Sequence, residues 1–288
     1  MTGAKNKRLV PYLMVAPYLI FLCVFVLFPV LFCFYLTFQK WNIIAPMEFV
    51  GVANYTRLFH DRLFWKAIGN TLKFLLLHIP LQLVVALFLA YVLNQKLKAV
   101  SFFRASFFMP VIISGVVVTI LWQQLLGFDT GLINRMLASL GFQKVGWLVN
   151  PGTAIYTIAV MATWKNVGLY VILFLVGLQT VPPQYYEAAK LEGATNWQQF
   201  YHITLPMINP TVFMVVILST IGGFSLFIEP YIMTGGGPLN TTLSAVLYIY
   251  KQAFQYYNMG YSATLGFFYA VMIMAVVVIQ KKIIEKEA

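Results

Sequence analysis

The sequence predicts an all-α, polytopic membrane protein with six transmembrane helices and with its N- and C-termini in the cytoplasm. Its 288 residues are 61% hydrophobic and only 9% charged, whereas soluble domains carry about 25% charged residues. Six apolar stretches are long enough, or nearly so, to cross about 30 Å of hydrocarbon as helices. They are Leu9 to Phe38, Leu72 to Leu93, Ala105 to Leu126, Ala154 to Leu178, Met207 to Ile228 and Tyr261 to Ile279. We therefore expect one transmembrane domain over residues 1–288.

The charge distribution supports this topology. The net charge of +11 comes from basic residues at the ends of the spans rather than from one patch, which argues for a lipid bilayer and against nucleic acid as the partner. With the N-terminus inside, the inner segments 1–8, 94–104, 179–206 and 280–288 hold ten Lys and Arg in 56 residues. The outer segments hold seven in 92. Cytoplasmic loops carry such an excess, so the termini and the loop 179–206 are expected in the cytoplasm.

The first three spans carry local signals. Pro11, Pro17 and Pro29 predict that the first span bends or begins late, which membrane helices tolerate when neighbours satisfy the freed carbonyls. Asn70-Thr71 suits the start of the second span. The inner loop 94–104 is short, so the second and third spans are expected to be antiparallel neighbours.

The fourth span holds Trp164 and Lys165 near its middle. A lysine at this depth costs roughly 2.5 to 3.5 kcal/mol on insertion scales, so it should face protein or a wet cavity. Two interpretations stay open. Lys165 either lines a translocation path or is tied internally to carbonyls or to Glu229.

The loop 179–206 is expected to form two short helices joined by a sharp turn. The pair Pro182-Pro183 can open the first helix, because the first turn needs no N–H partner. Gly193 is expected to end that helix. The pattern Thr195 to Gln198 is typical of a capping box that begins a second helix, and Pro206 is expected to end it.

The fifth span carries small and hydroxyl-bearing residues followed by a carboxylate. Ser219, Gly223 and Ser225 permit a kink and leave polar groups facing inward, as a path for a polar solute would require. They equally permit close helix packing without any solute. Glu229 is conspicuous because it is the acidic residue that borders a span.

The loop also contains a motif. Glu187-Ala-Ala is followed after three residues by Gly193, and after nine more by Ile203-x-Leu-Pro206. This spacing resembles the ATPase-coupling loop of ABC importer permeases, the membrane subunits of binding-protein-dependent uptake systems. The alternative is an ordinary loop between two membrane helices. The matching positions are Glu187, Ala188, Ala189, Gly193, Ile203, Leu205 and Pro206.

The resemblance extends over nearly the whole chain. The segments Trp164 to Gly168, Thr234 to Pro238 and Leu247 to Tyr250 are similar to the carbohydrate-uptake branch of these permeases. Within it, the pattern resembles the first permease of maltose, lactose, raffinose and glycerol-3-phosphate systems. The C-terminal Ile284 to Ala288 departs from the Gly-Ala-x-Lys-Gly tail of the second permease type, which implies a different second permease as partner.

What the resemblance implies is a heteromeric importer in the cell membrane of a prokaryote. The expected partners are a second permease, an ABC ATPase dimer, an extracytoplasmic solute-binding protein, and a di- or oligosaccharide or glycerol-3-phosphate as solute. The chain itself is expected to be no enzyme, with no catalytic residue, metal site or cofactor, because it contains no Gly-x4-Gly-Lys-Ser/Thr pattern. ATP and Mg would be held by the partner ATPase.

The resemblance also implies a sugar pocket midway through the membrane. Ser219 and Gly168 fall on a matching serine and glycine of the maltose system's pocket. Gly223 and Ser225 stand where that pocket uses asparagines, so the resemblance does not fix the sugar contacts or the solute. The full set expected along the path is Trp164, Lys165, Gly168, Ser219, Gly223, Ser225 and Glu229.

Two other classes compete with this interpretation. A secondary active transporter would show internal repeats and membrane-buried acidic residues, and Glu229 is the one acidic residue near a span. An intramembrane enzyme would need a convergent set of reactive groups. The histidines His60, His78 and His202 fall on outer, buried and inner segments and are too scattered for one site.

Overall fold

The computed structural model describes residues 3–95 and 100–284, which are almost entirely helical. The chain divides into two compact units, Met1–Asp61 with Ile249–Val271, and Arg62–Tyr248 with Met272–Ala288. Each is described by itself. The expected inner-loop residues Lys96 and Lys98, and the C-terminal tail after Ile284, lie outside the described residues.

The first unit contains the N-terminal apolar helix and a small hairpin. Its elements are α1 Gly3–Leu22, a π-helical turn Cys23–Leu27, α2 Phe28–Leu36, β1 Gln39–Lys40, β2 Glu48–Phe49, α3 Ala53–His60, a π-helical turn Lys251–Gln255 and the first part of α15 Met259–Ile284. The two strands pair antiparallel, Gln39 opposite Phe49. The Asn54 side-chain amide, which is buried, donates to the carbonyls of Thr37 and Gln39 at 2.9 Å each and so fixes the chain between α2 and the hairpin.

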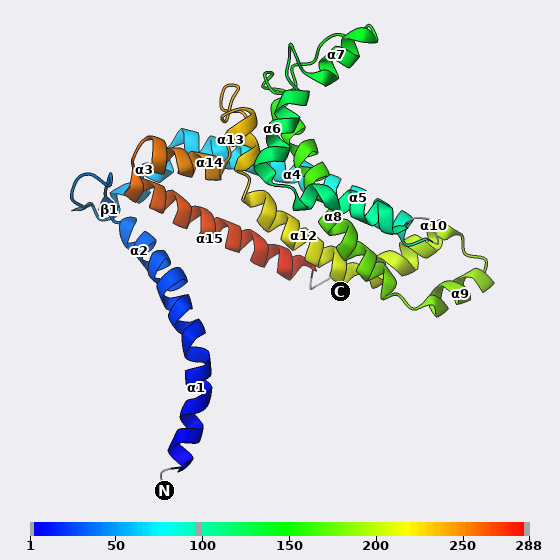
Figure 1. The fold of residues 1–288 in the computed structure, drawn as a ribbon, viewed down its shortest axis with the longest axis horizontal. Coiled ribbons are helices and arrows are strands. Elements are labelled where there is room, and N and C mark those ends of the chain that lie inside the picture. Colours follow the sequence, from blue (N-terminus) through cyan, green and yellow to red (C-terminus); the bar gives the residue numbers. More distant parts are fainter. Residues whose placement is uncertain (1–2, 96–99, 285–288) are drawn as a thin grey trace. The chain divides into compact units, whose positions relative to one another are not determined.

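The second unit is a helical assembly organised on α8 (Figure 1). Its elements are α4 Arg62–Leu93, α5 Val100–Ile112, α6 Gly115–Leu125, α7 Leu132–Ser139, α8 Ala154–Gln179, α9 Pro183–Leu191, α10 Asn196–Gln199, a π-helical turn Phe200–Thr204, α11 Leu205–Met207, α12 Asn209–Phe224, α13 Ile228–Met233 and most of α14 Ala245–Tyr250. Helices α4, α5 and α12 each pack against α8. This central position explains why α8 is the most buried of the long helices.

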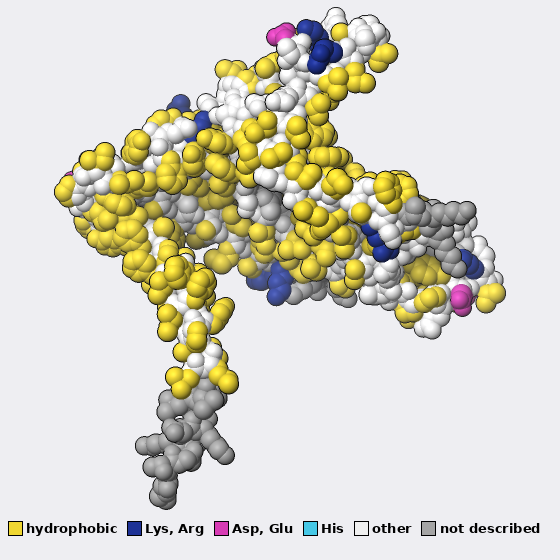
Figure 2. Space-filling view, viewed as in Figure 1, with side chains coloured by type: hydrophobic (Ala, Val, Ile, Leu, Met, Phe, Trp, Pro, Cys, Tyr) yellow, Lys and Arg dark blue, Asp and Glu magenta, His cyan; other side chains and the backbone are white. Residues whose placement is uncertain are grey.

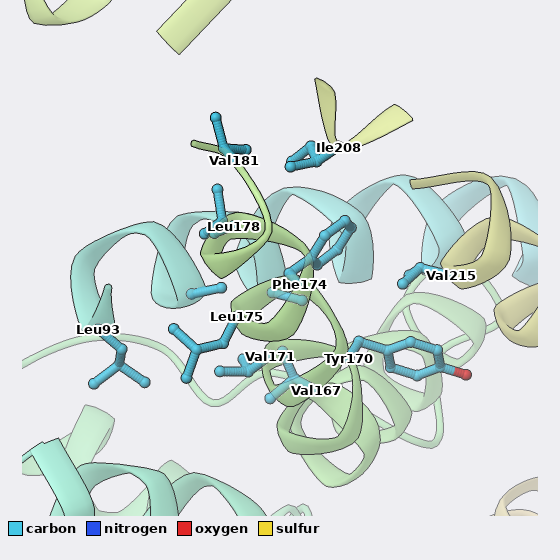
Figure 3. Packing of buried hydrophobic residues seen from close by; sticks show 12 residues of the cluster. Leu93, Val167, Tyr170, Val171, Phe174, Leu175, Leu178, Val181, Ile208 and Val215 are labelled. Carbon is cyan, nitrogen blue, oxygen red and sulfur yellow. The ribbon is translucent and has the colours of Figure 1, made fainter. Parts of the chain in front are cut away.

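The core of this unit follows one stripe of α8. Val167, Val171, Phe174 and Leu178 recur at the three- and four-residue spacing of a helix face, and they meet α4 and α12 side chains (Figure 3). Opposite them, α4 presents the pair Ala86 and Ala90, both fully buried. Small residues four apart let two helix backbones approach closely, and in lipid such packing holds helices together.

Five helices are long and apolar enough to cross a membrane within the described residues, or six if the bent pair α5 and α6 forms one span. Hydrophobic side chains dominate the visible surface of these helices and charged ones are sparse (Figure 2). Such a surface is suited to a bilayer rather than to water. The prediction of a predominantly helical membrane protein is confirmed, whereas the orientation of its termini stays a prediction.

Three spans differ from their predicted form. The third is not one helix, because α5 and α6 meet at 96° around Ser114, whose ψ of 129° is extended. The second begins ten residues early, at Arg62. The fifth is interrupted between Phe224 and Ile228, directly after the glycine pair in which a kink was expected.

One proline of the first span and one of the loop follow a π-helical turn. Pro29 and Pro206 each come two residues after the end of a π-helical turn, Cys23–Leu27 and Phe200–Thr204. A proline lacks the N–H that an α-helix would bond four residues back, and the wider turn accommodates that loss. The prediction that Pro206 ends its helix is therefore wrong, since helical structure continues to Met207.

Candidate functional site

A polar cavity of about 240 Å³ lies among α4, α8, α12 and α13. It combines hydroxyl, amide and charged groups with aromatic and aliphatic walls, which is the composition of a site for a polar solute. Its lining residues are Phe74, His78, Ala162, Lys165, Asn166, Tyr170, Ser219, Gly222, Gly223, Ser225, Leu226, Ile228 and Glu229.

An ion pair spans the cavity wall. Lys165 Nζ of α8 lies 3.7 Å from Glu229 Oε1 of α13, and both side chains are nearly buried, with 15% and 11% exposed. The separation exceeds the 2.7 to 2.9 Å of a tight charge-assisted hydrogen bond. Lys165 is thus tied to Glu229 and also lines the cavity. That this cavity belongs to a translocation path stays a prediction.

Lys165 reaches the break in the third span. A Cβ added to Gly115, the first residue of α6, would lie 2.6 Å from Lys165 Nζ. The ammonium therefore sits at the positive end of α6, an unfavourable position for a cation. The carboxylate of Glu229, in the first turn of α13, supplies the compensating charge.

A buried hydrogen bond lies behind another part of the wall. Ser219 Oγ of α12 donates to Gln82 Oε1 of α4 at 3.2 Å, and Gln82 is fully buried. Tyr170 of α8 lines the cavity beside Ser219. Its hydroxyl is seen at the edge of the core stripe in Figure 3. Within the described residues, Gln82 Nε2 has no hydrogen-bond partner.

His78 and Phe74 form a stacked pair on α4. Their ring centroids are 4.9 Å apart, and His78 Nδ1 lies 2.8 Å from Thr163 Oγ1. Since the Thr163 hydroxyl donates to the Ala159 carbonyl, we assign the Nδ1–H of His78 as the donor to Thr163. The arrangement holds the imidazole rigidly against the cavity.

Five of the seven residues predicted for the path line this cavity, namely Lys165, Ser219, Gly223, Ser225 and Glu229. The other two do not. Trp164 is 45% exposed and its ring lies 5.5 Å from that of Trp122. Gly168 is buried where α8 crosses α5, and a Cβ there would collide with the Phe107 carbonyl. Any contact of these seven with a solute stays a prediction.

Sequence reasoning missed several lining residues. Phe74 and Tyr170 belong to no motif, and Asn166 lies in the segment Trp164 to Gly168 but was not expected along the path. His78 was considered only as one of three scattered histidines. A usable signal was present, because Phe74 and His78 stand four residues apart and so share one helix face. Gln82, one further turn along, extends that face.

Apart from Pro206, the loop 179–206 has the predicted local structure. Pro182 caps α9 and Pro183 is its first residue, as expected. Gly193 follows the end of α9 with φ of +81°, a conformation natural to glycine. Thr195 and Gln198 form both hydrogen bonds of the capping box that begins α10.

One side of the loop is anchored and the other is exposed. Ile203 and Leu205 pack against the α8 core, and Tyr186 Oη lies 2.9 Å from Thr204 Oγ1. In contrast, Glu187, Ala188, Gly193 and Pro206 are exposed and Ala189 partly so. Within the described residues Glu187 forms no ion pair. Leu191, which belongs to no motif position, is 91% exposed at the end of α9. A partner surface is thus available on one face of α9.

The comparisons with known proteins match this architecture. Residues 74–286 match the family described as binding-protein-dependent transport system inner membrane component. The chain is 36% identical over 283 residues to the arabinooligosaccharides transport system permease protein AraP of Bacillus subtilis (strain 168), covering 96% of this chain and 89% of that protein.

Two solved structures share the fold. The crystal structure of a bacterial ABC transporter involved in the import of the acidic polysaccharide alginate contains a chain with TM-score 0.82 and 25% identity, covering 98% of both chains. The crystal structure of the bacterial alginate ABC transporter in complex with an alginate pentasaccharide-bound periplasmic protein contains a chain with TM-score 0.81 and 25% identity. The match covers 97% of this chain and 95% of that one. The matched residues 74–286 include both the cavity and the loop. The chain therefore belongs to the family of binding-protein-dependent transport system inner membrane components.

Proposed function

We propose that this chain is the permease subunit of an ABC importer that takes up a sugar, a di- or oligosaccharide or glycerol-3-phosphate, across a prokaryotic cell membrane. The observation that carries the proposal is the similarity to AraP across nearly the full length of both proteins. An extracytoplasmic binding protein delivers the sugar, as the periplasmic protein in the alginate complex suggests. A second, different permease completes the membrane part.

The cavity has the chemistry that a sugar needs. Hydroxyl groups of a sugar both donate and accept hydrogen bonds, and Asn166, Ser225 and Tyr170 offer both kinds of partner. The Phe74 ring supplies an apolar face against which the C–H groups of a sugar ring can pack. The volume of about 240 Å³ falls just below the roughly 300 Å³ at which small-molecule pockets begin, so this conformation accommodates part of an oligosaccharide.

The loop is the part that couples transport to ATP. In this proposal α9 docks in a cleft of one subunit of an ATPase dimer, which binds ATP and Mg. Glu187 offers a carboxylate for charge-assisted hydrogen bonds, and Ala188 and Gly193 leave room for close approach. Because Ile203 and Leu205 are packed on the α8 core, a push on α9 is transmitted to the helix that carries Lys165.

The decisive experiment is purification of the tagged chain from its native membrane in mild detergent, followed by mass spectrometry and by sugar uptake in reconstituted vesicles. We expect a second permease and an ATPase to co-purify, and uptake to require ATP and the binding protein. If the chain is purified alone and transports without ATP in response to an ion gradient, it is a secondary active transporter and the proposal is wrong.

A further inference from the structure

The charges that line the cavity sum to zero. Among the described lining residues, Lys165 and Glu229 carry the formal charges, one of each sign, with His78 counted as neutral. They form one pair on one wall. A solute that enters therefore meets an electrically balanced site in which the two charges lie side by side.

The geometry of the pair decides which solute groups it accepts. At 3.7 Å neither charge is saturated, since an ammonium has three donors and a carboxylate about four acceptor positions. A hydroxyl group can accept from Lys165 and donate to Glu229 at once, so it can bridge the pair. A carboxylate can accept from Lys165 but places a second negative charge beside Glu229.

The surroundings keep the Glu229 carboxylate beside Lys165. Lys165 Nζ already lies against the start of α6 at Gly115, and displacing Glu229 would leave a nearly buried carboxylate without its partner. Breaking one side of a buried pair is far more costly than the pair is stabilising. An acidic solute that displaced Glu229 from Lys165 would therefore leave the Glu229 carboxylate unpaired, at a large cost in free energy.

We propose that the Lys165–Glu229 pair makes this cavity selective for uncharged saccharides over acidic ones, with Glu229 as the excluding residue. The inference rests on the proposed sugar import and narrows its solute class. Family membership leaves this open, because relatives include importers named for arabinooligosaccharides and for the acidic polysaccharide alginate. We expect discrimination of about tenfold or more in Kd, which corresponds to about 1.4 kcal/mol.

The test uses the complete importer, purified without its binding protein so that the permease alone selects. Thermal stabilisation is titrated with maltose, cellobiose, galactobiose and the sugar found in the uptake assay, each paired with the uronate in which 6-hydroxymethyl groups are oxidised to carboxylates. Wild type should be stabilised by an uncharged sugar at concentrations about tenfold or more below its uronate. In Glu229→Gln the preference should shift toward the uronate, because Lys165 is left unpaired.

Two further variants serve as references. Asp129→Asn removes the carboxylate of the exposed Lys144–Asp129 pair, in which nitrogen and oxygen are 3.6 Å apart, and should leave the preference unchanged. The double variant Lys165→Gln/Glu229→Gln removes both charges at nearly constant shape and should bring the ratio of the two affinities toward one. It also keeps the test available if Glu229→Gln does not fold, as judged by size exclusion.

The remaining outcomes distinguish failure of the selectivity proposal from failure of the proposed function. Three results would overturn the selectivity proposal while sugar import stands. They are a wild-type preference for uronates, a preference that is unchanged both in Glu229→Gln and in the double variant, and a sugar that is taken up without stabilising the importer. Failure of the complete importer to take up any saccharide would instead overturn the proposed function.

Discussion

At the scale of single residues, glycine positions in the second unit separate into packing and turn positions. A Cβ at Gly168 would collide with the Phe107 carbonyl of α5, and one at Gly223 with the Leu75 side chain of α4. Around Gly193 there is open space, but its φ is +81°. Gly168 is required by the close approach of two helices, because the atom it meets is backbone, and Gly193 is required by the backbone turn. At Gly223 the atom in the way is the end of the Leu75 side chain, which can rotate.

Gly168→Ala should loosen the contact between α5 and α8. The collision is with backbone, which cannot rotate away, so we expect a loss of about 1 to 3 kcal/mol, typical of overpacking, measured as a lower unfolding temperature in detergent. Gly69→Ala is the matched control, because a Cβ in the middle of α4 at that position meets nothing within 4 Å. Equal behaviour of the two variants would contradict the packing argument.

Glu187→Lys should uncouple transport while the protein still inserts. The exposed carboxylate would become a cation, which cannot accept the charge-assisted hydrogen bonds proposed with the ATPase. We expect ATP-driven uptake to fall about tenfold or more, measured in reconstituted vesicles at matched protein content. Glu192→Lys makes the same charge change at the end of α9, where a cation suits the helix terminus, and should be milder. Full uptake by Glu187→Lys would remove the coupling role.

At the scale of elements, the corner between α9 and α10 is built from local chemistry. Pro183 begins α9, Gly193 turns the chain after its end, and the Thr195–Gln198 capping box begins α10. The next turn is π-helical and leads directly into α11, which contains Pro206. In this segment α9 is therefore exposed, while Ile203 and Leu205 pack against the α8 core.

Gly193→Pro should break this corner, because proline holds φ near −65° and the native value is +81°. We expect normal membrane insertion, faster hydrogen exchange of the α9 and α10 amides, and loss of ATP-coupled uptake. Gly193→Asn is the control, since asparagine tolerates the left-handed region, and it should retain most of the uptake. A fully active Gly193→Pro variant would show that the turn geometry is dispensable.

At the scale of the whole molecule, the orientation across the membrane that the charge distribution predicts can be tested directly. The excess of Lys and Arg predicts that the loop 179–206 is cytoplasmic and that the segment 127–153 is outside. Within the described residues the structure contains five candidate spans, or six if α5 and α6 form one span. Residues at exposed positions of these two segments can therefore decide the topology.

Single cysteines at Lys144 and Lys190, in a background with Cys23 and Cys33 replaced by Ala, should report opposite sides. An impermeant maleimide is expected to label Lys144→Cys in intact cells and Lys190→Cys only after permeabilisation. Both lysines lie in polar segments outside the candidate spans, so either substitution should leave insertion intact. The reverse labelling pattern would place α9 outside and exclude its docking on a cytoplasmic ATPase.

The sequence by itself determined what depends on local chemistry and on hydrophobic length. The bounds of α8, Ala154–Gln179, match the predicted span within one residue, and the capping box and Gly193 turn formed as expected. These features need only neighbouring residues, since caps, positive φ and apolar length act within a few turns.

Only the tertiary structure decided what depends on contacts between distant segments. The break at Ser114, the burial of Gly168 against α5 and the pairing of Lys165 with Glu229 each join residues from different helices. The cavity likewise gathers Phe74 of α4, Asn166 of α8 and Ser225, which follows α12. Periodicity shows that a residue lies on an apolar or a polar face, but the helix that covers this face is fixed by packing of the whole unit.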